Sequence, residues 1–235
     1  MVAQVKSPIK SQKKKPVAAA KPAIAKAKGT KKAAAAPPQP VAAKKKASGK
    51  FAKSRLISSR LAFKGRVFNV YADTVEEPNG LVLRRDVIRH NGSVVILALD
   101  ESKNPSDPDV ILERQYRHAA GQFLLELPAG RIEPNEAPLA AAKREMIEET
   151  GYRAKRWTLL TKYFASPGFL GEWMQLYLAR DISEGIAQPE ADEQIEILRI
   201  PFSEAMALVR ANKIHDGKTL IGLSLVDAAR REGRL

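Results

Sequence analysis

Three glutamates near the middle of the chain have a spacing that could bind a metal ion. Glu145, Glu148 and Glu149 stand at positions i, i+3 and i+4 of a segment rich in strong helix formers. On a helix this spacing brings three carboxylates together over one part of the surface. Like charges at a helix C-terminus repel one another and oppose the helix dipole, so a bound cation would offset the cost. Hard oxygen ligands select Mg²⁺, with Mn²⁺ as the alternative.

Residues suited to the two ends of a helix flank these glutamates. Pro138 suits the first turn, where its missing N–H costs nothing, and Gly151 suits the left-handed position just past the end. Arg144 has two acidic neighbours within reach and is expected to orient one of them. A solvated charged face is the simpler interpretation of Glu-x-x-Glu-Glu alone, so the spacing of the wider segment decides between the two.

The segment from Gly130 to Tyr152 resembles the Nudix box at every defined position. The residues that match the box are Gly130, Glu136, Arg144, Glu145, the aliphatic Met146, Glu148, Glu149, Gly151 and the bulky apolar Tyr152. The resemblance implies a loop–helix–loop metal site that hydrolyses a nucleoside diphosphate linked to another group. A degenerate box used for sensing or scaffolding is the alternative, and no box residue is lost here.

The resemblance also implies a role for each residue of the site. The metal ligands would be Ala129 (through its carbonyl), Glu145, Glu148 and Glu149. The residues that would support them structurally are Gly130, Glu136 (paired with Arg144), Arg144, Gly151 and Pro167. Bound divalent ions would neutralise the phosphates and lower the pKa of the attacking water.

Residues flanking the box narrow the substrate. The segments 113–117 (Glu-Arg-Gln-Tyr-Arg) and 126–130 (Glu-Leu-Pro-Ala-Gly) resemble the ADP-ribose pyrophosphatase branch. Pro167, 16 residues after Gly151, is similar to the marker proline of that branch. The implied reaction converts ADP-ribose to AMP and ribose 5-phosphate. Another nucleoside diphosphate sugar such as a GDP-sugar, NADH or a diadenosine polyphosphate remains an alternative substrate.

The same resemblance suggests substrate-binding residues and a general base. Arg117 would hold a phosphate through its planar fork, with a strand-end salt bridge as the alternative. Arg85 and Glu126 would hold other parts of the substrate. Members of this branch take the base from an acidic loop after the sheet, so we expect Glu193, with Glu190 second, to assist the box residue Glu148 in catalysis.

The apolar pattern predicts an α+β fold, a Nudix α/β/α sandwich with a mixed sheet. Strands are expected over residues 55–63, 66–71, 81–88, 93–99, 110–117, 155–164, 173–179 and 195–200, with 123–129 leading into the box. Later helices are expected to begin at an N-cap Ser203 and at Asp216. Residues 54–90 would form an N-terminal antiparallel strand subdomain that dimerises, and 91–235 the Nudix hydrolase domain.

The basic charge of the chain belongs to its N-terminal tail, residues 1–53. The tail holds 15 of the 40 Lys and Arg and no acid, leaving 25 basic residues against 26 acidic ones. Its Lys, Ala and Pro composition predicts disorder, and its charge predicts nonspecific binding to nucleic acid. The alternatives are a solubilising extension, or a tether for an ADP-ribose-sensing protein without catalysis.

Composition excludes several other classes of site. The chain has no Cys, which excludes disulfides and thiolate metal sites. No apolar run approaches a membrane span and no signal peptide is visible, so a cytoplasmic protein is expected. His90, His118 and His215 show no ligand spacing and are interpreted as ordinary histidines.

Overall fold

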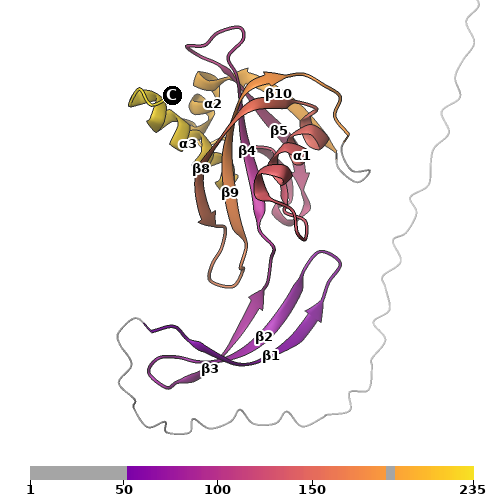
Figure 1. The fold of residues 1–235 in the computed structure, drawn as a ribbon, viewed down its shortest axis with the longest axis vertical. Helices are drawn as coiled ribbons and strands as arrows, with labels where there is room; N and C mark the ends of the chain where they lie inside the picture. Colours follow the sequence, from indigo (N-terminus) through magenta and orange to yellow (C-terminus); the bar gives the residue numbers. More distant parts are fainter. Residues whose placement is uncertain (1–51, 189–193) are drawn as a thin grey trace, which may run out of the picture. The chain divides into compact units, whose positions relative to one another are not determined.

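The first three strands form a small antiparallel sheet of their own. The structure is a computed structural model, and it describes residues 52–188 and 194–235. The strand order is β1 (Arg55–Lys64), β2 (Asn69–Glu76) and β3 (Val82–Ile88) (Figure 1). The strand expected over 66–71 begins three residues later, because Gly65 N–H donates to the Phe68 carbonyl at 3.0 Å and closes a turn.

The other seven strands form a mixed sheet. Its order is β10-β5-β4-β9-β8, with β6 added beside β5 and β7 beside β4. The pair β4–β9 is parallel and the remaining pairs are antiparallel. The strands are β4 (Ser93–Asp100), β5 (Asp109–Arg117), β6 (Gln122–Glu126), β7 (Ala129–Arg131), β8 (Arg153–Phe164), β9 (Trp173–Ser183) and β10 (Ile195–Pro201), with a 3₁₀ turn at His118–Ala120 between β5 and β6.

Helices cover both faces of this sheet, as the sequence predicted (Figure 1). Every residue of β4 is buried, and alternate side chains point to opposite faces. Leu97 packs in the cluster that includes residues of α2 (Phe202–Arg210) and α3 (Gly217–Arg231). Ile96 packs in the other cluster, with residues of α1 (Pro138–Thr150). The expected α/β/α sandwich is therefore confirmed.

The helix ends follow the sequence in two cases and depart from it in one. Helix α1 begins at Pro138 and is followed by Gly151, whose φ is +76°. Asp216 caps α3 by accepting the Thr219 N–H at 3.0 Å. The expectation that Ser203 caps α2 was wrong. Ser203 lies inside the helix, and its N–H and hydroxyl donate to Asp107 of the β4–β5 loop at 2.9 and 2.6 Å, so another loop supplies the acceptor.

The last residue of β3 is hydrogen-bonded to the loop between β8 and β9. Ile88 N–H donates to the Phe169 carbonyl at 2.8 Å, and Gly171 N–H donates to the Ile88 carbonyl at 2.9 Å. These bonds fix the direction in which residues 89–91 enter β4. Among the helices that the structure describes, none combines the length and the apolar character needed to cross a membrane.

Candidate active site

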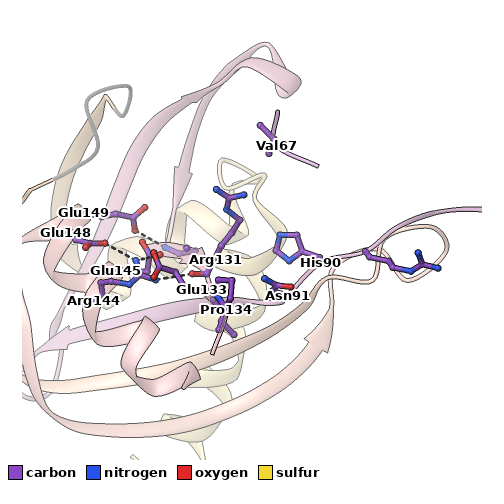
Figure 2. Close-up of a pocket in the computed structure, with 14 residues that line it drawn as sticks. Val67, His90, Asn91, Arg131, Glu133, Pro134, Arg144, Glu145, Glu148 and Glu149 are labelled. Atoms are coloured by element: carbon purple, nitrogen blue, oxygen red, sulfur yellow. Dashed lines mark hydrogen bonds and ion pairs between the residues drawn. The ribbon is translucent and has the colours of Figure 1, made fainter. Parts of the chain in front are cut away.

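The carboxylates of α1 face a cavity of about 530 Å³. Figure 2 shows the acidic side chains and Arg144 gathered at one side, with His90 and Asn91 at the other. The lining residues are Val67, Arg89, His90, Asn91, Ala129, Gly130, Arg131, Ile132, Glu133, Pro134, Arg144, Glu145, Glu148 and Glu149. Binding pockets for small molecules commonly have volumes of roughly 300–1,000 Å³, so this one is large enough for a nucleotide-sized ligand.

Arg144 connects the acidic residues of the site. Its fork donates to both carboxylate oxygens of Glu136, at 2.9 and 3.0 Å, and it also donates to Glu145 at 2.8 Å and Glu148 at 2.9 Å. A further bond at 3.1 Å reaches the carbonyl of Arg131 and ties the helix to β7. The hydrogen bond from Arg144 lowers the pKa of Glu136, and these acids raise the pKa of Arg144. Glu136 and Arg144 are thereby held in their charged forms.

Strand β7 approaches α1 so closely that only glycine fits at one position. The Ala129 N–H donates to Glu149 Oε2 at 3.0 Å. At Gly130 a Cβ atom would lie 1.9 Å from the Glu145 carboxyl carbon and 2.1 and 2.3 Å from its oxygens. The missing side chain of Gly130 therefore makes the space that the Glu145 carboxylate occupies.

The donor set of this cavity fits a hard divalent cation. The three glutamates of α1 that line it offer carboxylate oxygens, which Mg²⁺ and Mn²⁺ prefer. In the described part of the chain, no three acidic or imidazole side chains are close enough to hold a metal ion by themselves. That agrees with Mg²⁺ sites in which one or two carboxylates act together with substrate phosphates.

Glu113 of β5 is a buried acid that the sequence interpretation did not single out. It is 2% exposed, and its Oε1 has no hydrogen-bond partner among the described residues. Burial raises its pKa to about 8, although a hydrogen bond with Glu149 opposes the shift. An orphaned oxygen beside a box carboxylate is a further sign of a cation site. One sequence signal could have identified Glu113, because this acid directly follows the apolar run Val110–Leu112.

The structure pairs Arg117 with Glu126. Two parallel hydrogen bonds of 2.8 Å join the Arg117 fork to the Glu126 carboxylate, which also accepts from Lys218. Burial alone would raise the pKa of Glu126, but the hydrogen bonds from Arg117 and Lys218 bring it below its usual range. The salt bridge considered for Arg117 is thus present, while 40% of its side chain stays exposed. Lys218 was not singled out from the sequence.

Arg117 and Glu126 do not line the cavity, and the remaining predicted residues lie outside its lining or outside the described residues. Arg85 lies on β3 and donates to Glu77 at 2.8 Å. Pro167 lies in the loop between β8 and β9. Glu190 and Glu193, the residues expected to act as base, fall in the segment 189–193 that the structure does not describe.

Residues that join the two sheets form the cavity wall opposite the box. Arg89 donates to both oxygens of Asp73 at 2.9 Å and stacks over Tyr71. The His90 Nδ1 accepts the Gly92 N–H at 3.0 Å. His90 has no ligand spacing in the sequence, and only the path of the chain places it in the cavity lining with the box residues.

Comparison with known proteins places this geometry in a family. A family model described as NUDIX domain matches residues 89–221. The chain is also similar to a crystal structure of an ADP compounds hydrolase, with a TM-score of 0.68 and 23% identity. That match covers 80% of this chain and 100% of the other, and it supports the fold.

Three curated relatives are similar over most of the chain. An ADP-ribose pyrophosphatase of Bacillus subtilis (strain 168) is 35% identical over 72% of this chain and 90% of that protein. A methanol dehydrogenase activator of Bacillus methanolicus is 33% identical over 74% and 93%. A GDP-mannose pyrophosphatase of Salmonella typhimurium is 32% identical over 64% and 82%.

Proposed function

Because this chain belongs to the Nudix family and is a Nudix pyrophosphohydrolase, we propose that it hydrolyses the pyrophosphate bond of a nucleoside diphosphate sugar. We propose ADP-ribose as the preferred substrate, with AMP and ribose 5-phosphate as products. The relative named ADP-ribose pyrophosphatase supports this choice. The relative named GDP-mannose pyrophosphatase makes a GDP-sugar the first alternative.

The observation that carries the proposal is the arrangement of box carboxylates around Arg144 at the edge of the cavity. Arg144 binds Glu136, Glu145 and Glu148 at once, and Gly130 leaves room for the Glu145 carboxylate. A charged helix face with no function would need neither a bridging arginine nor a glycine fitted to one carboxylate. The carboxylates are therefore placed in advance for a ligand in the cavity.

We propose that Mg²⁺, with Mn²⁺ as a substitute, binds between α1 and the substrate phosphates. Glu145, Glu148, Glu149 and the carbonyl of Ala129 would hold it together with the substrate phosphates, because no three acidic side chains among the described residues lie close enough to hold an ion by themselves. An ion held by these residues would neutralise phosphate charge and lower the pKa of the attacking water. Arg144 and the Ala129 N–H keep these carboxylates in position, at 2.8–3.0 Å from their partners.

In the reaction proposed, the oxygen of a water molecule attacks one phosphorus of the diphosphate. The bond between that phosphorus and the bridging oxygen breaks, and the bridging oxygen leaves with the other phosphate. Glu193, or else Glu190, accepts the proton that the water loses, with the assistance of Glu148 of the box. A loop carboxylate that closes only over bound substrate would limit stray hydrolysis.

Arg117, Glu126 and Arg85 are proposed to bind the rest of the substrate. The Arg117 Nε and Nη2 donate to Glu126, which leaves the other N–H groups of the guanidinium for a phosphate. Arg85 lies on the small sheet and is paired with Glu77, so its role requires that the substrate or a second subunit reach that sheet. A substrate that displaced the Arg117–Glu126 pair would contradict the assignment.

We propose that residues 54–90 form a dimerisation subdomain and that the Nudix domain spans 91–235. Every residue of β1 is exposed, including Leu56, Leu61 and Phe63, each of which is at least 45% exposed. Large apolar side chains left exposed along one strand support an interface. Light scattering should give the mass of a homodimer, and a fully active monomer would contradict this.

The tail of residues 1–53 is proposed to bind nucleic acid without sequence preference, in a protein of the cytoplasm. Its 15 Lys and absence of acids support the electrostatic part of this proposal. A salt titration of DNA binding by the full chain and by a chain lacking residues 1–53 is the test. Equal weak binding by both would remove the proposal.

A substrate panel tests the proposed activity. ADP-ribose, GDP-mannose, NADH and a diadenosine polyphosphate are each incubated with the protein and Mg²⁺, and the nucleotide products are separated by chromatography. We expect the highest kcat/KM for ADP-ribose. Binding of ADP-ribose without any hydrolysis would indicate a sensor in place of an enzyme.

A further inference from the structure

Lys218, in the first turn of α3, has a largely buried charged side chain that the proposed reaction does not use. Its side chain is 10% exposed. Its Nζ donates to Glu126, whose side chain is 2% exposed, and lies 3.1 Å from Asp216. Burying a lysine is costly unless it is paired, and replacing a buried ion pair by well-packed apolar residues often leaves the stability unchanged or higher. The fold alone therefore gives little reason for a charge at this position.

The first turn of α3 also binds the residue next to Glu126. The Thr219 hydroxyl donates to Asp216 at 2.7 Å and accepts the Leu127 N–H at 2.7 Å. At Gly222 a Cβ would lie 2.6 Å from the Leu127 side chain, so the helix also packs tightly against this residue. One helix end thus fixes two consecutive residues of the segment that leads into the box.

Contacts continue from these residues to the proposed site in two directions. Glu126 also accepts both bonds of the Arg117 fork, at 2.8 Å each, and its Oε2 accepts from Arg117 and Lys218 alike. Three residues after Glu126, the Ala129 N–H donates to the box carboxylate of Glu149 at 3.0 Å. Lys218 and Arg117 therefore bind the same carboxylate from two different elements, α3 and β5.

We propose that Lys218 is a positioning residue that fixes Glu126, and through it the Arg117 fork, in the orientation that binds the diphosphate of the substrate. The inference rests on the proposed function. Without the Lys218 contact, Glu126 can rotate toward whichever donors remain, and the exposed side of the Arg117 guanidinium turns with it. Substrate affinity should fall more than turnover, because the contact is made equally before and during the reaction.

The test compares Lys218→Met, which keeps the length and removes the charge, with a control at another paired cation. The control is Arg180→Met, because Arg180 of β9 forms its ion pair with Glu101 and not with Glu126 or Arg117. We expect Lys218→Met to raise KM for ADP-ribose about tenfold, as for a lost charge-assisted hydrogen bond, with kcat within about twofold. Arg180→Met should lower the melting temperature and leave KM unchanged.

A double-mutant cycle shows whether Lys218 acts through Glu126. If it does, adding Lys218→Met to Glu126→Gln should raise KM by less than about twofold, because coupled residues are not additive. The double variant also leaves fewer unpaired buried charges than Lys218→Met alone. It can therefore be compared with Glu126→Gln if Lys218→Met does not fold. Full additivity, or a Lys218→Met variant that loses only thermal stability, would overturn the inference.

Calorimetric titration of ADP-ribose in EDTA separates this inference from the proposed function. Wild type that binds ADP-ribose in EDTA but does not cleave it once Mg²⁺ is added would refute the activity, while about tenfold weaker binding by Lys218→Met would still support the inference. Wild type that cleaves ADP-ribose, with Lys218→Met binding as tightly, would refute the inference alone. Wild type that neither binds nor cleaves any member of the panel would refute both.

Discussion

Gly130→Ala is expected to damage the metal site and spare the fold. The new Cβ would lie 1.9 Å from the carboxyl carbon of Glu145, which no structure tolerates, so one of the two must move. The obstructing atoms are the far end of a flexible side chain, and Gly130 lies in a short strand paired with Val94. The Glu145 carboxylate should therefore turn away while the backbone stays in place.

The size of the effect follows from the contact that this rotation breaks. Glu145 accepts a hydrogen bond of 2.8 Å from Arg144, and its side chain is 13% exposed. A hydrogen bond to a charged group is worth roughly 1.5–3 kcal/mol, which corresponds to about 10–100-fold in affinity. We expect Mg²⁺ to bind Gly130→Ala more weakly by about that factor, with the melting temperature about 3–12 °C below wild type, since 1 kcal/mol shifts it by about 2–4 °C in a chain of this size.

Isothermal titration with Mg²⁺, thermal unfolding and ADP-ribose turnover measure the three quantities. Gly168→Ala is the matched control, because no atom lies within 4 Å of a Cβ built there. Wild-type metal affinity and turnover in Gly130→Ala would refute the reasoning that the Glu145 position matters. A variant that fails to fold would show instead that the backbone, and not the side chain, has to give way.

Three other predictions follow from particular residues. Glu193→Gln should lower turnover by roughly 10²–10⁴ while Mg²⁺ binding by calorimetry is unchanged, and a near-normal rate would exclude Glu193 as the base. Arg144→Lys should weaken Mg²⁺ binding about tenfold, because a point charge cannot replace the fork that reaches Glu136, Glu145 and Glu148. Burial raises the pKa of Glu113 from 4.5 to about 8, so the stability it contributes is complete below pH 4.5 and is lost as the pH rises toward 8. Urea unfolding in EDTA should therefore show a smaller loss of stability between pH 5 and 8 in Glu113→Gln than in wild type, and equal slopes would contradict the shift.

The box and its helix could be predicted from the sequence because their signals are local. Pro138 and Gly151 mark the helix ends, and the glutamates are spaced within two turns. The continuous apolar run at β4 likewise predicted a strand buried on both faces. In each case neighbouring residues in the chain determine the feature, so periodicity and turn chemistry suffice.

Contacts between distant segments were not predictable from local patterns. Lys218 meets Glu126 across 92 residues, and Ser203 finds its acceptor at Asp107 across 96. A residue such as Ser203 fits the local rule for a helix cap, yet the tertiary contact gives its hydroxyl another partner. Glu113 was overlooked because only the strand pairing reveals that it lies opposite Glu126.

The most direct test of the proposed activity is AMP release from ADP-ribose by protein stripped with EDTA, before and after Mg²⁺ is restored. If the carboxylates around Arg144 hold the ion that activates water, AMP should be absent before the addition. After the addition, the rate of AMP release should increase with the Mg²⁺ concentration. Equal release in both conditions, or none in either, would contradict that role for the α1 carboxylates.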